Sequence, residues 1–567
     1  MKTIEIWFRP LRTGLLWIWV CTAFGRAESD GGQTAAWVFF TDKPLATSSQ
    51  VHLSPKALAR RERLNLPAGG WSDRWPADNY VSAVRATGVT LRHRSRWLNA
   101  VSVEGTPAQL RTIAAFPFVQ EVRPLQVYHF PRLEASGAVA ANDHRDREGA
   151  TLDYGYATEQ IQQIQINRLH DLGYSGSGVR VLVMDTGFNL THPAFDSLQV
   201  VSQWDVINDD SVCANENDTE ASVGQHNHGT AVLSALAAYK PGELVGPAYG
   251  AEFLLAKTEI VDQEIELEED HYVAGLEWGE ARGAQVVSTS LGYLDWYTYC
   301  DMDGNTAVVT RAIDHAVTLG LVCVTAMGNE GAGSPPTDPC QDPLTYYMIA
   351  PADADSVIAV GAVDSKGNPA YFTSHGPTYD GRIKPEVCAR GVLTVAVNPN
   401  TDGYLYYNGT SLSTPLIGGA TAVLVQAHPD WTPMEVREAL IQTASQANLP
   451  DNTLGYGIAN FWEAYQYGSA GVESDQESVP QAWALIRAWP NPFNDAVTLS
   501  LRIQRRGKGT LRLVDMQGRE VETITSRWFE PGSYRFRIQW NDRSAGVYFV
   551  VLAGPSGRAV RKVIYLP

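Results

Sequence analysis

The central part of the chain alternates strongly apolar runs with helical stretches, and this restricts the folds open to it. Between residues 154 and 467 the apolar runs are continuous and rich in Val, Leu and Ile. Such runs are typical of parallel strands that are covered by helices on both faces. The pattern therefore predicts an α/β domain with a parallel sheet and helices on both faces. The expected strands are 179–184, 253–256, 285–290 and 321–325, and the expected helices are 229–238, 270–281 and 307–319.

The rest of the sequence is long enough for further domains. The chain has 567 residues, whereas one domain usually holds roughly 100–200 residues. Residues 28–150 show the patterns of two or three strands and three helices, which predicts a small α+β unit. Its strands are expected at 36–40, 98–103 and 119–123, and its helices begin near Ser54, Tyr80 and Thr106.

Two polar stretches separate the expected units. Residues 132–153 are polar and rich in Ala and Gly, as in an exposed connector that can be cleaved. Residues 468–481 are rich in Gly, Ser, Glu and Asp, which is typical of a linker. From 482 to 567, short alternating strands and turns predict a small β-sandwich. The expected organisation is 1–27, 28–150, 151–467, 468–481 and 482–567.

The first 27 residues have the pattern of a secretory signal peptide. Lys2, Arg9 and Arg12 precede an apolar run at 14–24, and Gly25-Arg26-Ala27 places small residues where a signal peptidase cuts. A membrane anchor is the alternative, but the run is about half of the roughly 20 residues that span a bilayer. We therefore expect export.

Charge and cysteine content narrow the setting further. The 62 Asp and Glu residues against 44 Lys and Arg give a net charge of −18, which disfavours nucleic acid as the main partner. Cys21 would leave with the signal, and the odd number that remains means that at least one thiol stays free or pairs with another chain. Cys323 lies in an apolar run and is expected to be buried, whereas Cys300 and Cys340 lie in polar loops and could pair.

Two polar residues lie where an α/β sheet usually carries its chemistry. Asp185 directly follows a predicted strand, and functional groups gather at the carboxyl ends of such strands. His228 lies at the start of a predicted helix, with His226 as a competitor two residues away. Each signal is weak alone, because Asp-Thr-Gly is also an ordinary turn and a histidine at a helix start is usually structural.

Ser411 and Asn329 complete a set of catalytic residue types. Ser411 precedes an apolar helix at 416–427, where the helix dipole favours negative charge, although it could simply be a helix cap. A serine nucleophile needs a base that takes its proton and a group that orients the base. Asp185, His228 and Ser411 supply these roles. Asn329 follows another predicted strand, and its amide could donate to an oxyanion.

Taken together, these residues resemble the subtilisin-like serine peptidases, or subtilases, over roughly 160–467. The order Asp, His, Ser is the order of subtilisin. The motifs are Asp185-Thr186-Gly187, His228-Gly229-Thr230, Ser290-Leu291-Gly292, Gly328-Asn329, Phe372-Thr373-Ser374-His375-Gly376-Pro377, Lys384-Pro385-Glu386 and Gly409-Thr410-Ser411 with Pro415. Ala231 and Leu412-Ser413 depart from the family pattern, at positions that perform no chemistry.

The resemblance also implies how a peptide would bind. Ser290, Leu291 and Gly292 would pair with the substrate backbone as an added strand. Ala326, Met327 and Gly328 would line the pocket for the side chain that precedes the scissile bond. The motifs at 374–377 and 384–386 would be structural. The preferred side chain in that pocket cannot be read from the sequence.

The flanking units resemble two further families. Residues 28–150, with Val119 to Pro124, resemble a subtilase propeptide that acts as an intramolecular inhibitor, although an unrelated α+β domain is the alternative. The C-terminal unit resembles a type IX secretion sorting domain of Gram-negative bacteria, and a purely structural module is the alternative. The motifs of this unit are Trp489-Pro490-Asn491-Pro492-Phe493-Asn494, Asp515-Met516-Gln517-Gly518-Arg519-Glu520 and Ala545-Gly546-Val547-Tyr548.

No cofactor is expected for the chemistry, and structural calcium is left open. The loop Asp301-Met302-Asp303-Gly304-Asn305 alternates oxygen ligands as a calcium loop does, but it lacks the distal Glu, and most such loops are plain turns.

The sequence as a whole predicts a secreted or surface-bound serine endopeptidase made as a zymogen. It would act on proteins or peptides, be inhibited by its own propeptide, and contact the secretion machinery through its C-terminal domain. Cleavage near 131–155 would free the enzyme. The alternatives are a catalytically silent pseudoenzyme that binds peptides at the cell surface, and a processing peptidase that cuts one partner.

Overall fold

The computed structural model describes residues 33–44, 47–125, 135–139, 152–261, 269–294, 297–467 and most of 483–565. In the C-terminal part the described ranges are 483–489, 496–503, 506–514, 519–530, 532–539, 546–555 and 557–565. The chain divides into two compact units, Met1–Ser469 and Ala470–Pro567, and each is described by itself. The expected signal segment and the linker at 468–481 lie outside the described residues.

A parallel sheet of seven described strands forms the centre of the first unit. Its order is β14-β13-β12-β11-β6-β10-β7, and every neighbouring pair is parallel. This confirms the α/β architecture that the apolar runs predict. The strands are β6 (Arg180–Asp185), β7 (Gln199–Asp205), β10 (Glu252–Lys257), β11 (Val286–Thr289), β12 (Val322–Ala326), β13 (Ile358–Val363) and β14 (Val387–Arg390).

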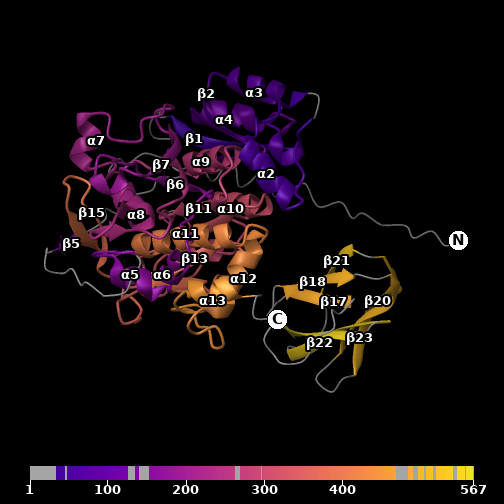
Figure 1. Cartoon of the computed structure of the whole chain (residues 1–567). Helices are drawn as coiled ribbons and strands as arrows, with labels where there is room; N and C mark the ends of the chain where they lie inside the picture. Colours follow the sequence, from indigo (N-terminus) through magenta and orange to yellow (C-terminus); the bar gives the residue numbers. More distant parts are fainter. Residues whose placement is uncertain are drawn as a thin grey trace. The chain divides into compact units, whose positions relative to one another are not determined.

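Helices cover both faces of this sheet (Figure 1). Alternate residues of β6 belong to two separate cores, Val181 and Val183 to one and Leu182 and Met184 to the other. Residues of α8 and α11 lie in the first core, and residues of α9 and α10 lie in the second. The helices are α5 (Thr158–Gln163), α6 (Asn167–Asp171), α7 (Asp218–Val223), α8 (Asn227–Ala237), α9 (Glu269–Ala281), α10 (Val308–Thr318), α11 (Thr410–Ala427), α12 (Pro433–Thr443) and α13 (Phe461–Gln466), with 3-10 turns η4 (Pro193–Phe195) and η5 (Tyr299–Asp301) and a short hairpin β8 (Tyr239–Lys240) and β9 (Leu244–Val245).

The N-terminal part forms an antiparallel sheet in the order β2-β3-β1-β4 with helices beside it (Figure 1). The expectation of two or three strands was wrong, because β2 has the polar sequence TLRHRS and gives no apolar signal. Two caps follow the sequence signals, since Ser54 accepts from Ala57 N and Thr106 forms a capping box with Gln109. The elements are β1 (Thr34–Phe40), α2 (Pro55–Arg63), η2 (Trp71–Asp73), α3 (Asp78–Arg85), β2 (Thr90–Ser95), β3 (Ala100–Gly105), α4 (Pro107–Ala114) and β4 (Val119–Pro124).

Strand β1 joins this small sheet to the central α/β domain. Val38 and Phe40 pack in the core of the N-terminal unit. Trp37 and Phe39 belong instead to the core that contains α9 and α10. Because β1 is buried on both faces, the two parts share one continuous apolar contact.

A third sheet contains a short strand from the expected connector. Strand β5 (Ala135–Ala138) pairs antiparallel with β16 (Tyr404–Tyr407), which pairs in turn with β15 (Thr394–Val397). Strand β5 lies within the connector expected over 132–153, and its four residues are exposed, since small residues such as Ser136 and Gly137 can pair through their backbone alone. Residues 132–134 and 140–151 of that stretch lie outside the described residues.

The C-terminal unit consists of two antiparallel sheets, with orders β17-β18-β21 and β20-β19-β22-β23. Buried residues such as Leu499, Leu513 and Leu552 form one core between them, which confirms the β-sandwich. The strands are β17 (Trp483–Trp489), β18 (Ala496–Ile503), β19 (Gly507–Val514), β20 (Glu520–Phe529), β21 (Gly532–Gln539), β22 (Gly546–Gly554) and β23 (Gly557–Tyr565).

The described cysteines follow the sequence-based expectations. Cys300 and Cys340 form a disulfide with a Cα–Cα distance of 5.1 Å. Cys323 is buried and free, as are Cys213 and Cys388. Within the described ranges, none of the helices is both long and apolar enough to cross a membrane.

Candidate active site

Asp185 lies at the carboxyl end of β6, in the middle of the parallel sheet. Its Oδ1 accepts hydrogen bonds from Thr186 N at 2.8 Å and from Thr186 Oγ1 at 3.2 Å. The side chain is fully buried. A buried carboxylate held in this way has a fixed orientation and can fix that of a neighbour.

His228 is the second residue of α8, because the helix begins at Asn227, two residues before the expected start at 229. Its Nδ1 donates to Asp185 Oδ1 at 2.6 Å, and its ring is also buried. A carboxylate can only accept, so this bond places the proton on Nδ1 and leaves Nε2 as the basic nitrogen of the neutral ring. His226 instead accepts at Nδ1 from Asn215 N at 3.1 Å, a structural contact.

Two glycines allow the close contact between β6 and α8. A Cβ on Gly229 would contact the carbonyl oxygen of Gly187 and would lie 2.9 Å from Asp185 Cβ. Gly187 has a φ of 127°, in the region that favours glycine. The small residue after His228 is thus required by the approach of the helix to the strand.

Ser411 lies in the first turn of α11, which begins at Thr410 and has Gly409 as its N-cap. The alternative that Ser411 caps the helix is therefore wrong. Its Oγ donates to the carbonyl oxygen of Ser290 at 3.4 Å, and Ser290 Oγ donates to the carbonyl oxygen of Ser411 at 2.8 Å. These two bonds fix Ser411 against the end of β11.

The second of these bonds compensates for Pro415 inside the helix. In an α-helix the carbonyl of residue 411 would accept from the N–H of residue 415, but proline has no N–H. The Ser290 hydroxyl takes that place. The proline therefore makes the carbonyl of Ser411 available to Ser290, and the pair links β11 to the helix that carries the serine.

Asn329 lies beside the same turn. Its Oδ1 accepts from Thr410 N at 2.9 Å and from Thr410 Oγ1 at 3.0 Å. Because a backbone N–H can only donate, the carbonyl side of the amide must face Thr410. The position of a Cβ on Gly409 would lie 3.8 Å from Asn329 Nδ2 and 3.6 Å from Ser411 N. Two donors thus flank the glycine in front of Ser411, which is the donor set that an oxyanion needs.

The residues expected to bind substrate flank this turn. Leu291 and Met327 are buried in the core below the sheet, so their side chains are not exposed in this structure. A Cβ on Gly292 would contact Ile349, and one on Gly328 would lie 2.8 Å from Ser374 Oγ. Ala326, also buried, ends β12, and Ser290 follows β11.

The motifs expected to be structural hold these loops in place. Ser374 Oγ accepts from Glu330 N at 2.9 Å, and Ser374 N donates to the carbonyl of Gly328 at 3.1 Å. Lys384 Nζ and Glu386 Oε1 form a buried ion pair at 3.1 Å. Sequence reasoning did not find the bonds from Thr410 to Asn329 and from Ser290 to the carbonyl of Ser411, although these residues lie in the quoted motifs.

Comparison with known proteins agrees with this geometry. A model of the subtilase family matches residues 176–457, a model of the peptidase S8 propeptide domain of Bacteroidota matches 35–137, and a model of the secretion system C-terminal sorting domain matches 487–565. The chain is 32% identical to subtilisin E of Bacillus subtilis (strain 168) over 326 residues, which cover 57% of this chain and 74% of that protein. The chain belongs to the subtilase family.

Other subtilases show similar agreement. The subtilisin of Bacillus pumilus is 32% identical over 286 residues, which cover 50% of this chain and 90% of that protein. Subtilisin Savinase of Lederbergia lenta is 30% identical over 301 residues, which cover 53% of this chain and 95% of that protein. The protein is thus a member of the subtilisin-like serine peptidases, and its two flanking matches indicate a protein that a Gram-negative Bacteroidota secretes by the type IX system. This confirms the predicted family, fold and localisation.

Charged side chains join the propeptide to this subtilase's α9. Arg60 and Arg61 from α2 and Arg96 from the end of β2 surround Glu280, and all four are buried. Arg61 Nη2 lies 2.9 Å from Glu280 Oε1 and Arg96 Nη2 lies 2.7 Å from Glu280 Oε2, while Arg60 contacts Oε1 as well. Burial alone would raise the pKa of Glu280, but the three arginines outweigh it and hold that pKa below its ordinary value.

Structural calcium, which the sequence leaves open, would need a group of oxygen ligands, and two acidic sites of the described residues supply such groups. In the loop at 301–305, Asp301 accepts from Thr298 N at 2.8 Å, and Asp303 accepts from Asn305 N and Thr306 N at 2.8 Å. These carboxylates cap their own turns. The loop is the plain turn that the sequence analysis kept as an alternative.

Asp205, Asp210 and Glu216 form the second acidic group, with carboxylate oxygens within 4.8 Å of one another. The ammonium of Lys257 lies 2.8 Å from Asp205 Oδ2 and 2.9 Å from Glu220 Oε1. Burial alone would lower the pKa of Lys257, but these two carboxylates outweigh it and raise that pKa. The ammonium of Lys257 occupies Asp205 Oδ2 and offsets part of the negative charge, so a calcium ion at this group would have to compete with it.

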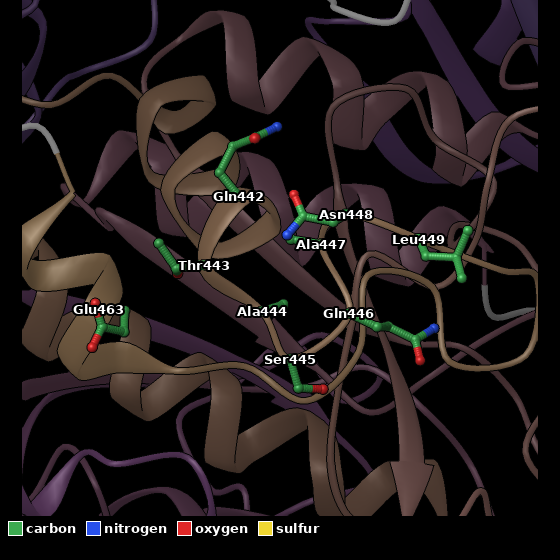
Figure 2. A pocket seen from close by; sticks show the side chains of 9 residues that line it. All are labelled: Gln442, Thr443, Ala444, Ser445, Gln446, Ala447, Asn448, Leu449 and Glu463. Atoms are coloured by element: carbon green, nitrogen blue, oxygen red, sulfur yellow. The ribbon is translucent and has the colours of Figure 1, made fainter.

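A pocket of about 570 Å³ lies apart from the site (Figure 2). It is lined by the end of α12, the loop that follows it and Glu463 of α13. None of the residues expected to be catalytic or to bind substrate lines it. Its location gives it no part in the chemistry.

Proposed function

We propose that this subtilase is a secreted serine endopeptidase made as a zymogen, with Asp185, His228 and Ser411 as its catalytic triad. The observation that carries the proposal is the 2.6 Å bond between the buried His228 ring and Asp185. It places the proton of the neutral ring on Nδ1, so that Nε2 is the nitrogen that would accept the proton of Ser411. Asn329 and the N–H of Ser411 flank Gly409, the N-cap of α11.

The proposed chemistry follows from these positions. Ser411 Oγ attacks the carbonyl carbon of a peptide bond while His228 takes its proton. The tetrahedral intermediate carries a negative oxygen, which Asn329 Nδ2 and the N–H of Ser411 stabilise. His228 then gives its proton to the leaving amine, and a water molecule hydrolyses the acyl group. Asp185 keeps the ring in the correct tautomer and stabilises its charged form.

Substrate binding would use backbone more than side chains. The segment of Ser290 and Gly292 would pair with an extended peptide through its backbone, and Ile349 leaves no room for a side chain at Gly292. Ala326 and Gly328 would form one wall of the pocket for the residue before the scissile bond. We propose proteins or peptides in extended conformation as substrates.

The flanking parts would control when and where this activity starts. We propose a signal peptide at 1–27, an inhibitory propeptide at 28–150, the peptidase at 151–467, a linker at 468–481 and a sorting domain at 482–567 that contacts the secretion machinery. The buried arginines around Glu280 support the inhibitory role, because they bind the propeptide firmly to α9 of the peptidase.

The test compares the wild type with Ser411→Ala and with Ser413→Ala as the matched control in the same helix. We expect the wild type and Ser413→Ala to lose the propeptide and to hydrolyse casein, and Ser411→Ala to do neither. If Ser411→Ala still matures and cleaves casein, the proposed nucleophile is wrong. If all three stay intact and inactive, the proposed peptidase activity is wrong, and peptide binding by a silent homologue takes its place.

A further inference from the structure

One side chain occupies the space beside both segments that are expected to bind the substrate, 290–292 and 326–328. A Cβ on Gly292 would overlap Ile349 Cδ1, and a Cβ on Gly328 would lie 3.2 Å from Ile349 Cγ1 and from Ile349 Cγ2. Both glycines therefore face the same isoleucine. A glycine leaves room beside the backbone because it has no side chain, and here Ile349 fills that room.

Backbone hydrogen bonds hold Ile349 in this position. Its N–H donates to the carbonyl oxygen of Met327 at 3.3 Å. The next residue, Ala350, exchanges two bonds with Tyr293: Tyr293 N donates to the carbonyl oxygen of Ala350 at 2.8 Å, and Ala350 N donates to that of Tyr293 at 3.1 Å. The segment that carries Ile349 is thus bonded to both walls of the expected pocket.

Ile349 is also the residue of this segment that reaches solvent. It is 7% exposed, whereas its neighbours Met348 and Ala350 are fully buried. Toward the interior, Ile349 belongs to the apolar core that contains Leu291 and Met327. The isoleucine therefore presents an apolar surface to solvent, and the packed core behind it leaves little room for it to move inward.

We propose that Ile349 is the floor of the pocket for the side chain before the scissile bond, and that it restricts this side chain to that of Gly, Ala or Ser. The inference rests on the proposed function, to which it adds a class of substrate. A longer side chain would need the space that Ile349 occupies, and overfilling a packed apolar site is unfavourable. The reaction at Ser411 is unchanged, and the pocket only selects which peptide bond reaches it.

The experiment uses short peptides that differ only in the residue before a p-nitroanilide leaving group, which is Ala, Leu or Phe. The measured quantity is kcat/KM of the matured enzyme, from the release of p-nitroaniline. We expect the Ala peptide to exceed the Leu and Phe peptides by at least about tenfold, because one methylene in an apolar pocket changes discrimination on the order of 10–200-fold. A wild type that prefers the Leu or the Phe peptide would overturn the inference.

Two variants test whether Ile349 itself sets the limit. Ile349→Ala opens the floor, so the ratio of kcat/KM between the Ala and the Phe peptide should fall on the order of 10–200-fold. Ile349→Val removes one methylene and should give a ratio between those of the wild type and Ile349→Ala. Each ratio compares two substrates on one preparation, so it does not depend on how much of a variant folds.

Ile441→Ala is the matched control. Ile441 is an isoleucine of α12 with similar burial, 4% exposed, and it lies outside both substrate-binding segments. The control should keep the wild-type ratio of the Ala to the Phe peptide even if its stability falls. A ratio that stays at the wild-type value in Ile349→Ala would contradict the inference.

The outcomes separate this inference from the proposed function. If the wild type cleaves all three peptides equally well and Ser411→Ala cleaves none, the inference is wrong and the function stands. If Ser411→Ala cleaves the peptides as fast as the wild type, both proposals are wrong. If the wild type hydrolyses neither these peptides nor casein, the proposed function fails and the inference fails with it.

Discussion

At the scale of single residues, the contact between Asp185 and His228 depends on two glycines beside it. Gly187 and Gly229 leave no side chain where β6 meets α8, and Asp185 therefore reaches His228 Nδ1 at 2.6 Å. Both side chains are buried, so little water competes for the bond. The pairing is fixed before any substrate binds.

Replacing Asp185 with Asn should leave the fold intact and lower kcat on the order of 10³–10⁴-fold, because an amide no longer fixes the ring in the tautomer that leaves Nε2 basic. The measurement is casein hydrolysis by the matured enzyme. Asp196→Asn, at the exposed end of η4, serves as the control and should keep the wild-type rate. A normal rate in Asp185→Asn would rule out this role.

The catalytic residues could be predicted from the sequence, but the contacts that hold them in place could not. Asp185, His228, Asn329 and Ser411 are recognisable because each lies in a short local motif. The bond between Ser290 Oγ and the carbonyl of Ser411 joins residues 121 positions apart, and only the folded chain brings them together. Because Pro415 has no N–H, the sequence indicates that the carbonyl of Ser411 lacks its usual helical donor. It does not indicate which group donates in its place.

At the scale of elements, α9 carries acidic residues on a buried face. Glu277 accepts from Ser95 Oγ at 2.6 Å and from the N–H groups of Arg96 and Trp97 at 3.0 Å. Glu280 pairs with the three arginines described above. The sequence of α9 predicts a helix but not burial of its carboxylates, because the cations that neutralise them come from the propeptide.

Glu280→Gln should weaken the attachment of the propeptide strongly, since it removes the one carboxylate that Arg60, Arg61 and Arg96 share, and only Asp73 and Glu277 remain to balance their charges. Breaking such a buried group typically costs roughly 3–5 kcal/mol. Urea unfolding of the uncleaved Ser411→Ala precursor measures this as a shift of the first transition to lower urea. Glu121→Gln, at an exposed pair with Arg123, should shift it little, and equal shifts would contradict the explanation.

Lys257 gives a second prediction at this scale, about calcium. In the Ser411→Ala precursor, calcium should add no stability through the group of Asp205, Asp210 and Glu216, because the ammonium of Lys257 already lies there. Lys257→Met should lower the free energy of unfolding by roughly 3 kcal/mol in EDTA, because it removes the cation from beside buried Asp205. In this variant, calcium should restore part of the lost stability.

Thermal unfolding with and without calcium measures the difference between the two proteins. Lys366→Met, at an exposed lysine, is the control and should respond to calcium as the parent protein does. A parent that gains as much from calcium as Lys257→Met would show that the ion and the lysine do not compete.

Strands β2 and β5 were harder to predict, because contacts with segments distant in the sequence hold them in place. Strand β2 is polar, so its place beside β3 follows from burial against α9 and not from its own pattern. Strand β5 consists of residues with low strand preference and is ordered by β16. In both cases a tertiary contact determines a structure that the local sequence does not favour.

At the scale of the whole molecule, the join between propeptide and peptidase should depend on pH. His315 of α10 lies beside Trp97, with ring centroids 5.2 Å apart. Burial, and then the neighbouring Arg96, lower the pKa of His315 to about 4, while Glu280 acts in the opposite direction and Lys43 and Arg61 add to the lowering. The unfolded chain, with an ordinary histidine pKa near about 6.5, therefore binds more protons between these two values.

It follows that the contribution of neutral His315 to stability is present above about pH 6.5 and is lost as pH falls toward about 4. His315→Asn in the Ser411→Ala precursor should remove this pH-dependent contribution. The free energy of unfolding should therefore fall by roughly 1 kcal/mol less between pH 7.5 and pH 5 in the variant than in the parent. The comparison between variants is needed because burial raises the pKa of Glu269 to about 7, which acts with the opposite sign.

Thermal unfolding at the two pH values provides the measurement. His52→Asn, at an exposed position, is the matched control and should show the pH response of the parent. If His315→Asn also keeps the parent's response, the half-buried imidazole of His315 does not account for the acid sensitivity.

The arrangement of the molecule was largely predictable where apolar runs are continuous. The strands around β6, β10, β11 and β12 follow from those runs, and two antiparallel sheets of the C-terminal unit follow from alternation and turns. The core that β1 shares with α9 could not be predicted from the sequence. An apolar strand such as β1 shows burial on both faces, but the sequence does not show whether the second face packs against a neighbouring segment or against one far along the chain.

The state of the cysteines bears on how the chain oxidises during export. Burial raises the pKa of Cys213 to about 12, and it raises the pKa of Cys323 and Cys388 further. Thiol–disulfide exchange needs a thiolate, so these three folded thiols cannot attack the bond between Cys300 and Cys340. Wrong pairings can form only while the chain is unfolded, and folding of the central sheet itself ends the exchange.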